Sequence, residues 1–274
     1  MLRAVFIGHR NRLNAVIAGW LARECDLVEC VWIDPSTRWH QSWNGRWRFI
    51  KRRLRKRGAL KTLDEIAYFL FHHATDRNSR NTRASYALVD EAERSLALAE
   101  VPCGIVTASV NDAAVLARLE ALAPDVIFAH CLNEYFGQRL RRCARTGIFM
   151  WHVGITPEYR GLYSPFWTLY NGDVENFGYS LIHVNDDLDA GAVYVQGRIS
   201  DVDVRHDNHV LIEHRAILAS LPAVGRFLRA LEDGSARAIE RPDAREGYYS
   251  YPGLTDYLAQ RWRVSRLARR GNFV

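Results

Sequence analysis

The stretch GIFMWHVGITPEYRG, residues 147–161, changes character at a single histidine. Its first half is an apolar run typical of a buried strand, and its second half is a loop bounded by proline and glycine. His152 stands at the change, between Trp151 and Val153. Two hypotheses follow: the ring is a packed core residue with a satisfied hydrogen bond, or it takes part in a reaction at the mouth of a sheet.

Apolar runs and helical periodicity alternate on both sides of this stretch. Their order predicts an α/β fold with a Rossmann-like, parallel-rich sheet and right-handed crossovers. Ligands bind such sheets at the carboxyl ends of strands, so we expect the function at 8–11, at 130–134 and from His152 onward. The expected strands are 3–8, 26–34, 103–108, 125–133, 178–186 and 192–200, and the expected helices are 14–22, 111–124, 137–145 and 209–232.

The rhythm breaks at 35–100, where a Trp- and Arg-rich stretch is longer than a normal connection. Helical patterns at 46–57, 60–74 and 84–99 favour a helical insertion over a lid. We therefore expect a catalytic domain at 1–200 that contains this insertion. A mostly helical C-terminal extension, 201–274, is expected to pack on that domain.

The composition is that of an ordinary globular protein, with 48% hydrophobic and 25% charged residues in a chain of 274. No apolar run approaches the roughly 20 residues that cross a bilayer, and the start has no signal-peptide pattern. The five cysteines form no CxxC pair and are expected to be reduced thiols. We expect a cytoplasmic protein with no membrane partner and no metal.

The formal charge of +6 is concentrated in basic runs at 51–57, 139–145 and 261–270. The first is typical of a solvated helix face, whereas the others could attract an anionic substrate or a polyglutamylated cofactor. Charge alone would permit nucleic-acid binding without indicating it. We expect no nucleic-acid partner.

Residues 147–199 resemble the core of the formyltransferase family, which includes the glycinamide ribonucleotide, methionyl-tRNA and sugar-amine transformylases. The resemblance extends over about 50 residues of ordered motifs and a tail motif, EGYYSYPGLTDYL at 246–258. Residues 35–100 have no counterpart in the best-known members, and the part after 200 is too short for the barrel of the tRNA-specific ones. The matching motifs are His152, the loop Pro157 to Gly161, Pro165 with Trp167, Gly172 with Asp173, and Leu188 to Gly191.

The resemblance implies a reaction in which a substrate amine attacks the formyl carbon of 10-formyltetrahydrofolate. It implies that His152 handles protons and the developing oxyanion and that Asp189 orients the histidine. Arg10, in the stretch GHRN, could bind a phosphate or carboxylate of the acceptor or could belong to a plain turn. By position, the folate-binding residues are Leu132, Asn133, Tyr135, Val184, Asn185, Asp186 and Leu188, and the acceptor-binding residues are Arg10, Asn11 and Arg160.

One family residue is missing: Met150 stands where the family carries an asparagine that donates to the oxyanion. A thioether cannot donate a hydrogen bond. Asn133 and His130 are the nearest replacements by topology, while a methionine in a buried strand is also an ordinary core residue. The alternatives are therefore an N-formyltransferase acting on a small amine, a formyltetrahydrofolate hydrolase, or a folate-binding member with impaired catalysis. A homodimer is left open.

Overall fold

A seven-stranded sheet organises the molecule, in the order β3-β2-β1-β4-β5-β7-β8. The computed structural model describes residues 1–34, 51–76, 79–130, 134–185 and 191–269. The sheet strands are β1 (Arg3–His9), β2 (Asp26–Ile33), β3 (Ile105–Thr107), β4 (Val126–His130), β5 (Gly147–His152), β7 (Gly178–His183) and β8 (Val193–Arg198). The first five are mutually parallel, β7 is antiparallel to β5, and β8 is antiparallel to β7. The predicted α/β fold with a mostly parallel sheet is confirmed.

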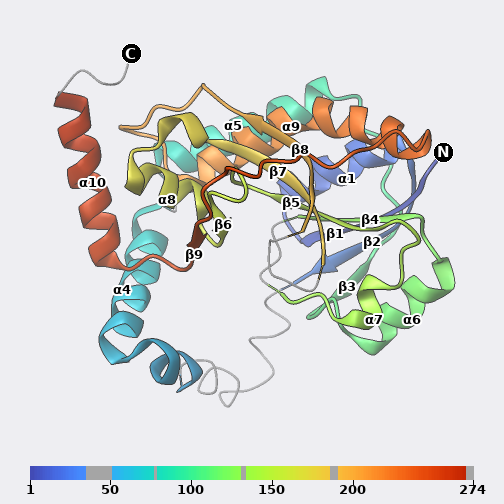
Figure 1. Ribbon diagram of the computed structural model, residues 1–274, viewed down its shortest axis with the longest axis horizontal. Coiled ribbons are helices and arrows are strands. Elements are labelled where there is room, and N and C mark those ends of the chain that lie inside the picture. Colours follow the sequence, from blue (N-terminus) through green and yellow to red (C-terminus); the bar gives the residue numbers. More distant parts are fainter. Residues whose placement is uncertain (35–50, 77–78, 131–133, 186–190, 270–274) are drawn as a thin grey trace.

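Helices cover both faces of this sheet (Figure 1). The helices are α1 (Arg12–Glu24), α4 (Ala59–Asp76), α5 (Arg80–Ser95), α6 (Ala113–Leu122), α7 (Gln138–Arg141), α8 (Ser164–Asn171), α9 (His209–Glu232) and α10 (Leu254–Arg269). A 3-10 turn spans Val174–Asn176, and β6 (Arg160–Gly161) pairs with β9 (Tyr248–Tyr249) in a second, two-stranded sheet. Residues 51–57 are also helical.

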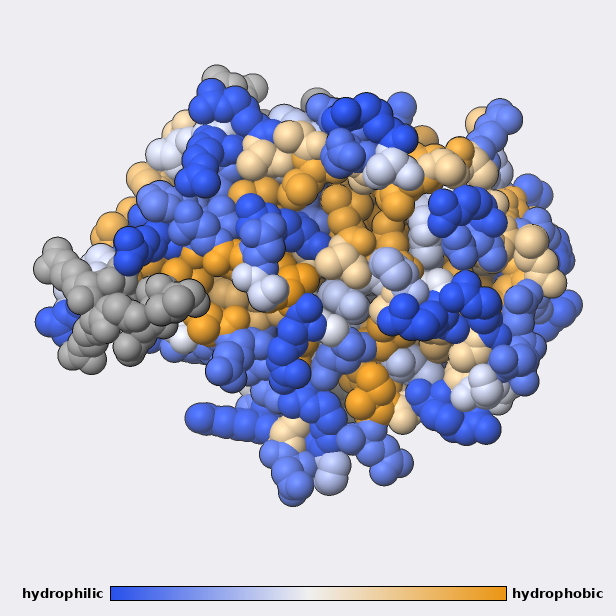
Figure 2. Space-filling view, turned by 90° about the horizontal axis from the view of Figure 1, so that it is seen from above, coloured by the Kyte–Doolittle hydropathy of each residue, from blue (hydrophilic) through white to orange (hydrophobic). Residues whose placement is uncertain are grey.

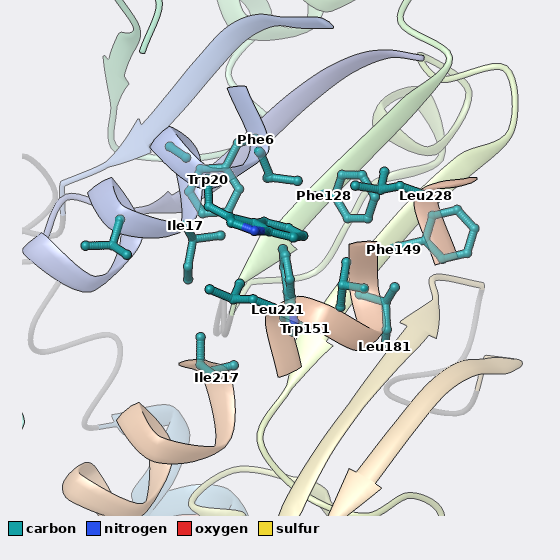
Figure 3. Close-up of a cluster of buried hydrophobic side chains, with 14 of the residues drawn as sticks. Phe6, Ile17, Trp20, Phe128, Phe149, Trp151, Leu181, Ile217, Leu221 and Leu228 are labelled. Carbon is teal, nitrogen blue, oxygen red and sulfur yellow. The ribbon is translucent and has the colours of Figure 1, made fainter. Parts of the chain in front are cut away.

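The larger core lies between the sheet and the layer of α1, α5 and α9. Figure 3 shows Trp151 from β5 among Trp20 of α1, Phe128 of β4 and Leu221 of α9. The opposite face packs α6 and α7 against a second cluster that includes Met150. Because side chains alternate along β5, Trp151 belongs to the first face and Met150 with His152 to the second.

The helices of the predicted insertion are present, with residues 35–50 outside the described part. The 84–99 pattern becomes α5, which begins earlier because the Ser79 hydroxyl caps it by accepting from Thr82 N, 3.1 Å away. α5 packs on α1 and α9, so it belongs to the layer that covers the sheet. α4 and α10 lie together at one edge of the molecule, away from the sheet (Figure 1).

The face uppermost in Figure 1 is seen directly in Figure 2, where hydrophobic residues lie in patches divided by strongly hydrophilic ones. Within the described ranges, no helix has the length and apolar character needed to cross a bilayer.

Candidate active site

A cavity of about 720 Å³ opens at the carboxyl edge of the parallel strands. This volume lies in the range of small-molecule sites. Its walls come from the ends of β1 and β5, the segment 161–165, α9 and the C-terminal segment around β9. The wall residues are His9, His72, Glu134, Tyr135, Met150, Trp151, His152, Val153, Gly161, Leu162, Tyr163, Ser164, Pro165, His209, Val210, Glu213, Tyr248 and Tyr251.

His152 is buried and also forms part of this wall. Its Nε2 lies 2.6 Å from the backbone oxygen of Tyr159 and 3.2 Å from the Ser164 hydroxyl. A carbonyl oxygen only accepts, so Nε2 carries the hydrogen. Nδ1 is then the basic nitrogen of the ring, because an imidazole protonated on one side keeps its lone pair on the other.

Gly154 makes this hydrogen bond sterically feasible. A Cβ at this position would lie 2.8 Å from the Ser164 Cβ, 2.9 Å from the Tyr159 oxygen and 3.0 Å from His152 Nε2. Real Cβ atoms essentially never approach below 3.0 Å. The small residue therefore lets the strand end and the loop 155–164 meet closely enough to fix the ring.

The loop that carries the Tyr159 carbonyl is held by side-chain contacts and by strand pairing. The Tyr159 hydroxyl donates to Asp173 Oδ2 at 2.8 Å, and its ring stacks on Tyr249 at 5.3 Å. Gly161, at φ +94°, allows β6 to pair with β9 in close contact. Trp167 Nε1 donates to Ser250 O at 2.7 Å. The motif residues of the loop thus act as a scaffold that joins the 157–173 region to the C-terminal segment.

Met150 lines the cavity on the same side of β5 as His152. It pairs with Ala129 on β4 and with Ile182 on β7, both apolar. The position that would supply an oxyanion donor is therefore apolar together with its cross-strand neighbours.

His130 does not replace that donor. Its register partner is Trp151, so its side chain lies on the opposite face of the sheet from Met150. Its Nδ1 donates to Asn14 Oδ1 at 2.5 Å, and its Nε2 is buried with no hydrogen-bond partner among the described residues. Burial, with smaller effects of His214 and His9, lowers the pKa of His130 to about 3. A neutral ring in this tautomer presents only an acceptor at Nε2.

Glu213 is a wall residue that sequence reasoning missed. It lies near the start of α9 and faces the cavity, where burial raises the pKa of its carboxyl to about 7. Within the described part of the chain it makes no hydrogen bond or ion pair. The nearby His209 is neutral, because burial and then His72 lower its pKa to about 3. The only sequence signal for Glu213 was its place beside His214 and Arg215 in a mostly apolar helical segment.

Of the predicted site residues, His152 and Tyr135 line one cavity. Arg10 is exposed in the turn after β1, and Asn11 caps α1 by accepting from Asn14 N at 2.9 Å. Arg160 pairs with Glu246 at 2.9 Å. Val184 and Asn185 follow β7, with Val184 N donating to Ile148 O at 2.8 Å. The remaining predicted residues, Leu132, Asn133, Asp186, Leu188 and Asp189, lie outside the described residues.

The described wall holds two acids, Glu134 and Glu213, and no lysine or arginine. Glu134 is anchored, since Val110 N donates to its Oε2 at 3.0 Å. Across the ranges that the structure describes, no group of three or more His, Cys, Asp or Glu side chains could hold a metal ion. The arrangement can bind an organic cation or amine and can accept a proton at His152 Nδ1 or at Glu213.

Comparison with solved structures finds proteins of similar fold. The fold is similar to that of a candidate sugar N-formyltransferase from Mycobacterium tuberculosis, at 14% identity and a TM-score of 0.55 over 96% of this chain and 87% of that one. A sugar N-formyltransferase from Shewanella sp. is 11% identical, with a TM-score of 0.55 over 96% of this chain and 88% of that one. Glycinamide ribonucleotide transformylase 1 from Symbiobacterium toebii is 14% identical, with a TM-score of 0.53 over 93% of this chain and 94% of that one.

At these identities the likeness to solved structures shows the fold alone. The sequence itself matches the family model described as formyl transferase at residues 65–217, which is more than half of the chain. The matched segment includes the end of β5, the loop after it and the first turns of α9. The chain belongs to the formyl transferase family.

Proposed function

We propose that the protein is an N-formyltransferase that moves a formyl group from 10-formyltetrahydrofolate to the amine of a small metabolite. The observation that carries the proposal is the orientation of His152: its Nε2 is committed to the Tyr159 carbonyl, which leaves Nδ1 as a base in the wall of a ligand-sized cavity. In such a transfer the amine nitrogen bonds to the formyl carbon, the bond from that carbon to folate N10 breaks, and one proton passes from the amine to N10.

Glu213 supports an amine as the acceptor. The group lies in the same cavity as His152 and has no cationic partner among the described residues. A carboxylate without a counter-ion attracts an ammonium group, and a pKa of about 7 suits a group that takes up a proton near neutral pH. The absence of lysine and arginine from the described wall favours an amine over a phosphate at this position.

The test uses the purified full chain, 10-formyltetrahydrofolate and a panel of amines that includes amino sugars, nucleotide-linked amino sugars and glycinamide ribonucleotide. Release of tetrahydrofolate is followed spectroscopically. We expect one class of amine to accelerate it, and His152→Ala to reduce the rate about 10²- to 10⁴-fold, the range for a general base. His206→Ala, an exposed histidine in the loop before α9, is the matched control. The proposal fails if no amine accelerates turnover and His152→Ala changes nothing.

Met150 favours a second candidate, a folate-binding member with impaired catalysis, because the apolar strand position offers no donor to an oxyanion. In that case 10-formyltetrahydrofolate binds, which calorimetry detects, but no amine is formylated. A hydrolase would instead release formate at the same rate with and without an amine.

A further inference from the structure

α4 is built with its polar side toward the protein and its apolar side toward solvent. Its buried residues are Thr62, Glu65 and Tyr68. The outward side carries the large exposed hydrophobics Leu60 (85% exposed), Leu63 (62%), Ile66 (39%), Phe69 (63%) and Leu70 (60%). A surface helix normally shows the reverse arrangement, and contiguous exposed apolar residues mark an interaction site.

The acids of α4 are all engaged on the inner side. Asp64 accepts from the Thr255 hydroxyl at 2.7 Å, and Glu65 pairs with Arg53 at 2.6 Å. Asp76 accepts from Asn208 Nδ2 at 2.8 Å. The outward side of the helix therefore presents apolar side chains without a negative charge.

A basic helix precedes this face. Residues 51–57, KRRLRKR, carry six basic side chains and no acid, which equals the formal excess of +6 for the whole chain. The rest of the sequence is therefore electrically balanced. Arg53 is turned inward, toward Glu65 and the ring of Tyr251. Lys51, Arg52, Arg55, Lys56 and Arg57 are exposed.

We propose that α4 and residues 51–57 form a surface that docks on an anionic lipid membrane, with the apolar side of α4 in the headgroup boundary and the basic helix against the acidic headgroups. A helix with a broad apolar side next to clustered Lys and Arg has the composition of an interfacial, non-spanning anchor. The sequence expectation of no membrane partner rested on the lack of a bilayer-spanning segment. A helix that lies on the membrane surface needs no such segment. This inference is independent of the proposed reaction.

A second copy of the chain fits this surface less well than a membrane does. A two-fold interface brings the same patch together from both partners. This patch offers exposed positive charges and no exposed acid of α4 to neutralise them. Nucleic acid fits less well too, because the large aliphatic side chains Leu60, Leu63 and Leu70 would stay in water.

The experiment measures flotation of the full-length protein with phosphatidylcholine vesicles that contain either no anionic lipid or 40% phosphatidylglycerol. We expect binding only to the anionic vesicles, and weaker binding as salt is raised from 0.1 to 0.5 M. Leu63→Glu with Leu70→Glu should reduce partitioning at least tenfold. Arg52→Glu with Arg55→Glu should reduce it by more than 25-fold, since each basic residue near such a surface contributes about fivefold.

Matched controls are Ile239→Glu, an exposed apolar residue outside the surface, and Arg94→Glu on α5. Both should bind as the wild type does, and circular dichroism should show that every variant is folded. The proposal is overturned if the wild type does not float with anionic vesicles, or if it floats and the two leucine substitutions leave binding unchanged. A concentration-dependent dimer that Leu63→Glu with Leu70→Glu abolishes, without vesicle binding, would also overturn it in favour of self-association.

Discussion

At the scale of single residues, Met150 decides how fast the proposed transfer can be. The side chain shares the cavity with His152 but donates no hydrogen bond, and its cross-strand neighbours Ala129 and Ile182 are apolar. Removal of one oxyanion donor typically costs about 10² to 10³ in rate. His130 cannot supply it, because its ring lies on the other face of the sheet and its Nδ1 is bound to Asn14.

We predict that Met150→Asn raises the rate of formyl transfer about 10- to 100-fold, because an amide at this position can donate toward the developing oxyanion. The same substitution should lower the free energy of unfolding by about 1–3 kcal/mol, since it buries a polar group in an apolar site. Single-turnover kinetics and urea unfolding measure the two effects. Met150→Leu is the control for volume, and a loss of activity in Met150→Asn would show that the site has adapted to the thioether.

Gly154 offers a test of the orientation of His152. We predict that Gly154→Ala reduces transfer about 10- to 100-fold, because the added methyl group displaces the ring or the Tyr159 carbonyl. Overpacking should also cost about 1–3 kcal/mol in the free energy of unfolding. Gly225→Ala on α9 is the control, since its Cβ would meet no atom closer than that of Trp20 at 3.5 Å, an ordinary van der Waals contact. Full activity in Gly154→Ala would contradict the close packing around the imidazole.

At the scale of elements, α9 both packs against the hydrophobic core and contributes side chains to the cavity wall. Asn208 begins the helix by accepting from Leu211 N at 2.9 Å. One side of the helix then packs on the sheet, while Glu213 reaches the cavity. Periodicity predicted this helix at 209–232, in agreement with its observed bounds. It could not assign Glu213 a function, because the exposure of that side chain depends on the loop 161–165 and on α4, which are distant in the sequence.

Glu213 should impose a pH dependence on the reaction. Its pKa is raised to about 7, so the carboxylate that binds an ammonium group forms as the pH increases through 7. We predict that kcat/KM rises across this range in the wild type. In Glu213→Gln the rise should disappear, with about a 10- to 100-fold lower kcat/KM at pH 8, the loss expected when a hydrogen bond to a charged group is removed. Glu232→Gln, at the other end of α9, is the control. An unchanged pH profile in Glu213→Gln would remove the residue from the acceptor site.

The pattern of elements was predictable because hydrophobic periodicity follows local geometry. The strands β1, β2, β4, β7 and β8 and the helices α1, α6 and α9 occur where apolar spacing placed them. The predicted helix at 137–145 shrinks to α7, Gln138–Arg141, and the chain continues in turns and bends through 146 although Cys143 and Ala144 are buried. The support of His152 was beyond sequence reasoning, because its hydrogen-bond partner is a backbone carbonyl that any residue at 159 would supply.

At the scale of the whole molecule, the cavity is assembled from segments spread over most of the chain. His9, His152, His209 and Tyr251 all contribute to its wall. Among them His209 is buried and neutral, because burial and then His72 lower its pKa to about 3, so protonation of the molecule and its stability are coupled. This coupling reaches beyond the site, since His130 lies in the core beside α1.

Stability should therefore decrease as the pH falls below 6.5. The folded-state pKa values of His130 and His209 are lowered from 6.5 to about 3, so between these values the unfolded chain binds two protons that the folded chain does not. Glu213 acts in the opposite direction between pH 4.5 and 7, because its pKa is raised in the folded state. From these three groups the net uptake on unfolding is about one proton, which corresponds to about 1.4 kcal/mol per pH unit.

We predict that removal of the opposing carboxyl in Glu213→Gln increases this slope to about 2.8 kcal/mol per pH unit between pH 4.5 and 6.5. Urea unfolding of both proteins at half-unit intervals of pH gives the two slopes directly. Glu232→Gln, whose carboxyl is exposed and pairs with the N-terminus, should keep the wild-type slope. A wild-type stability that stays level or rises from pH 6.5 to 4.5 would mean that water reaches the imidazoles of His130 and His209, and that the walls of the cavity open more readily than their packing indicates.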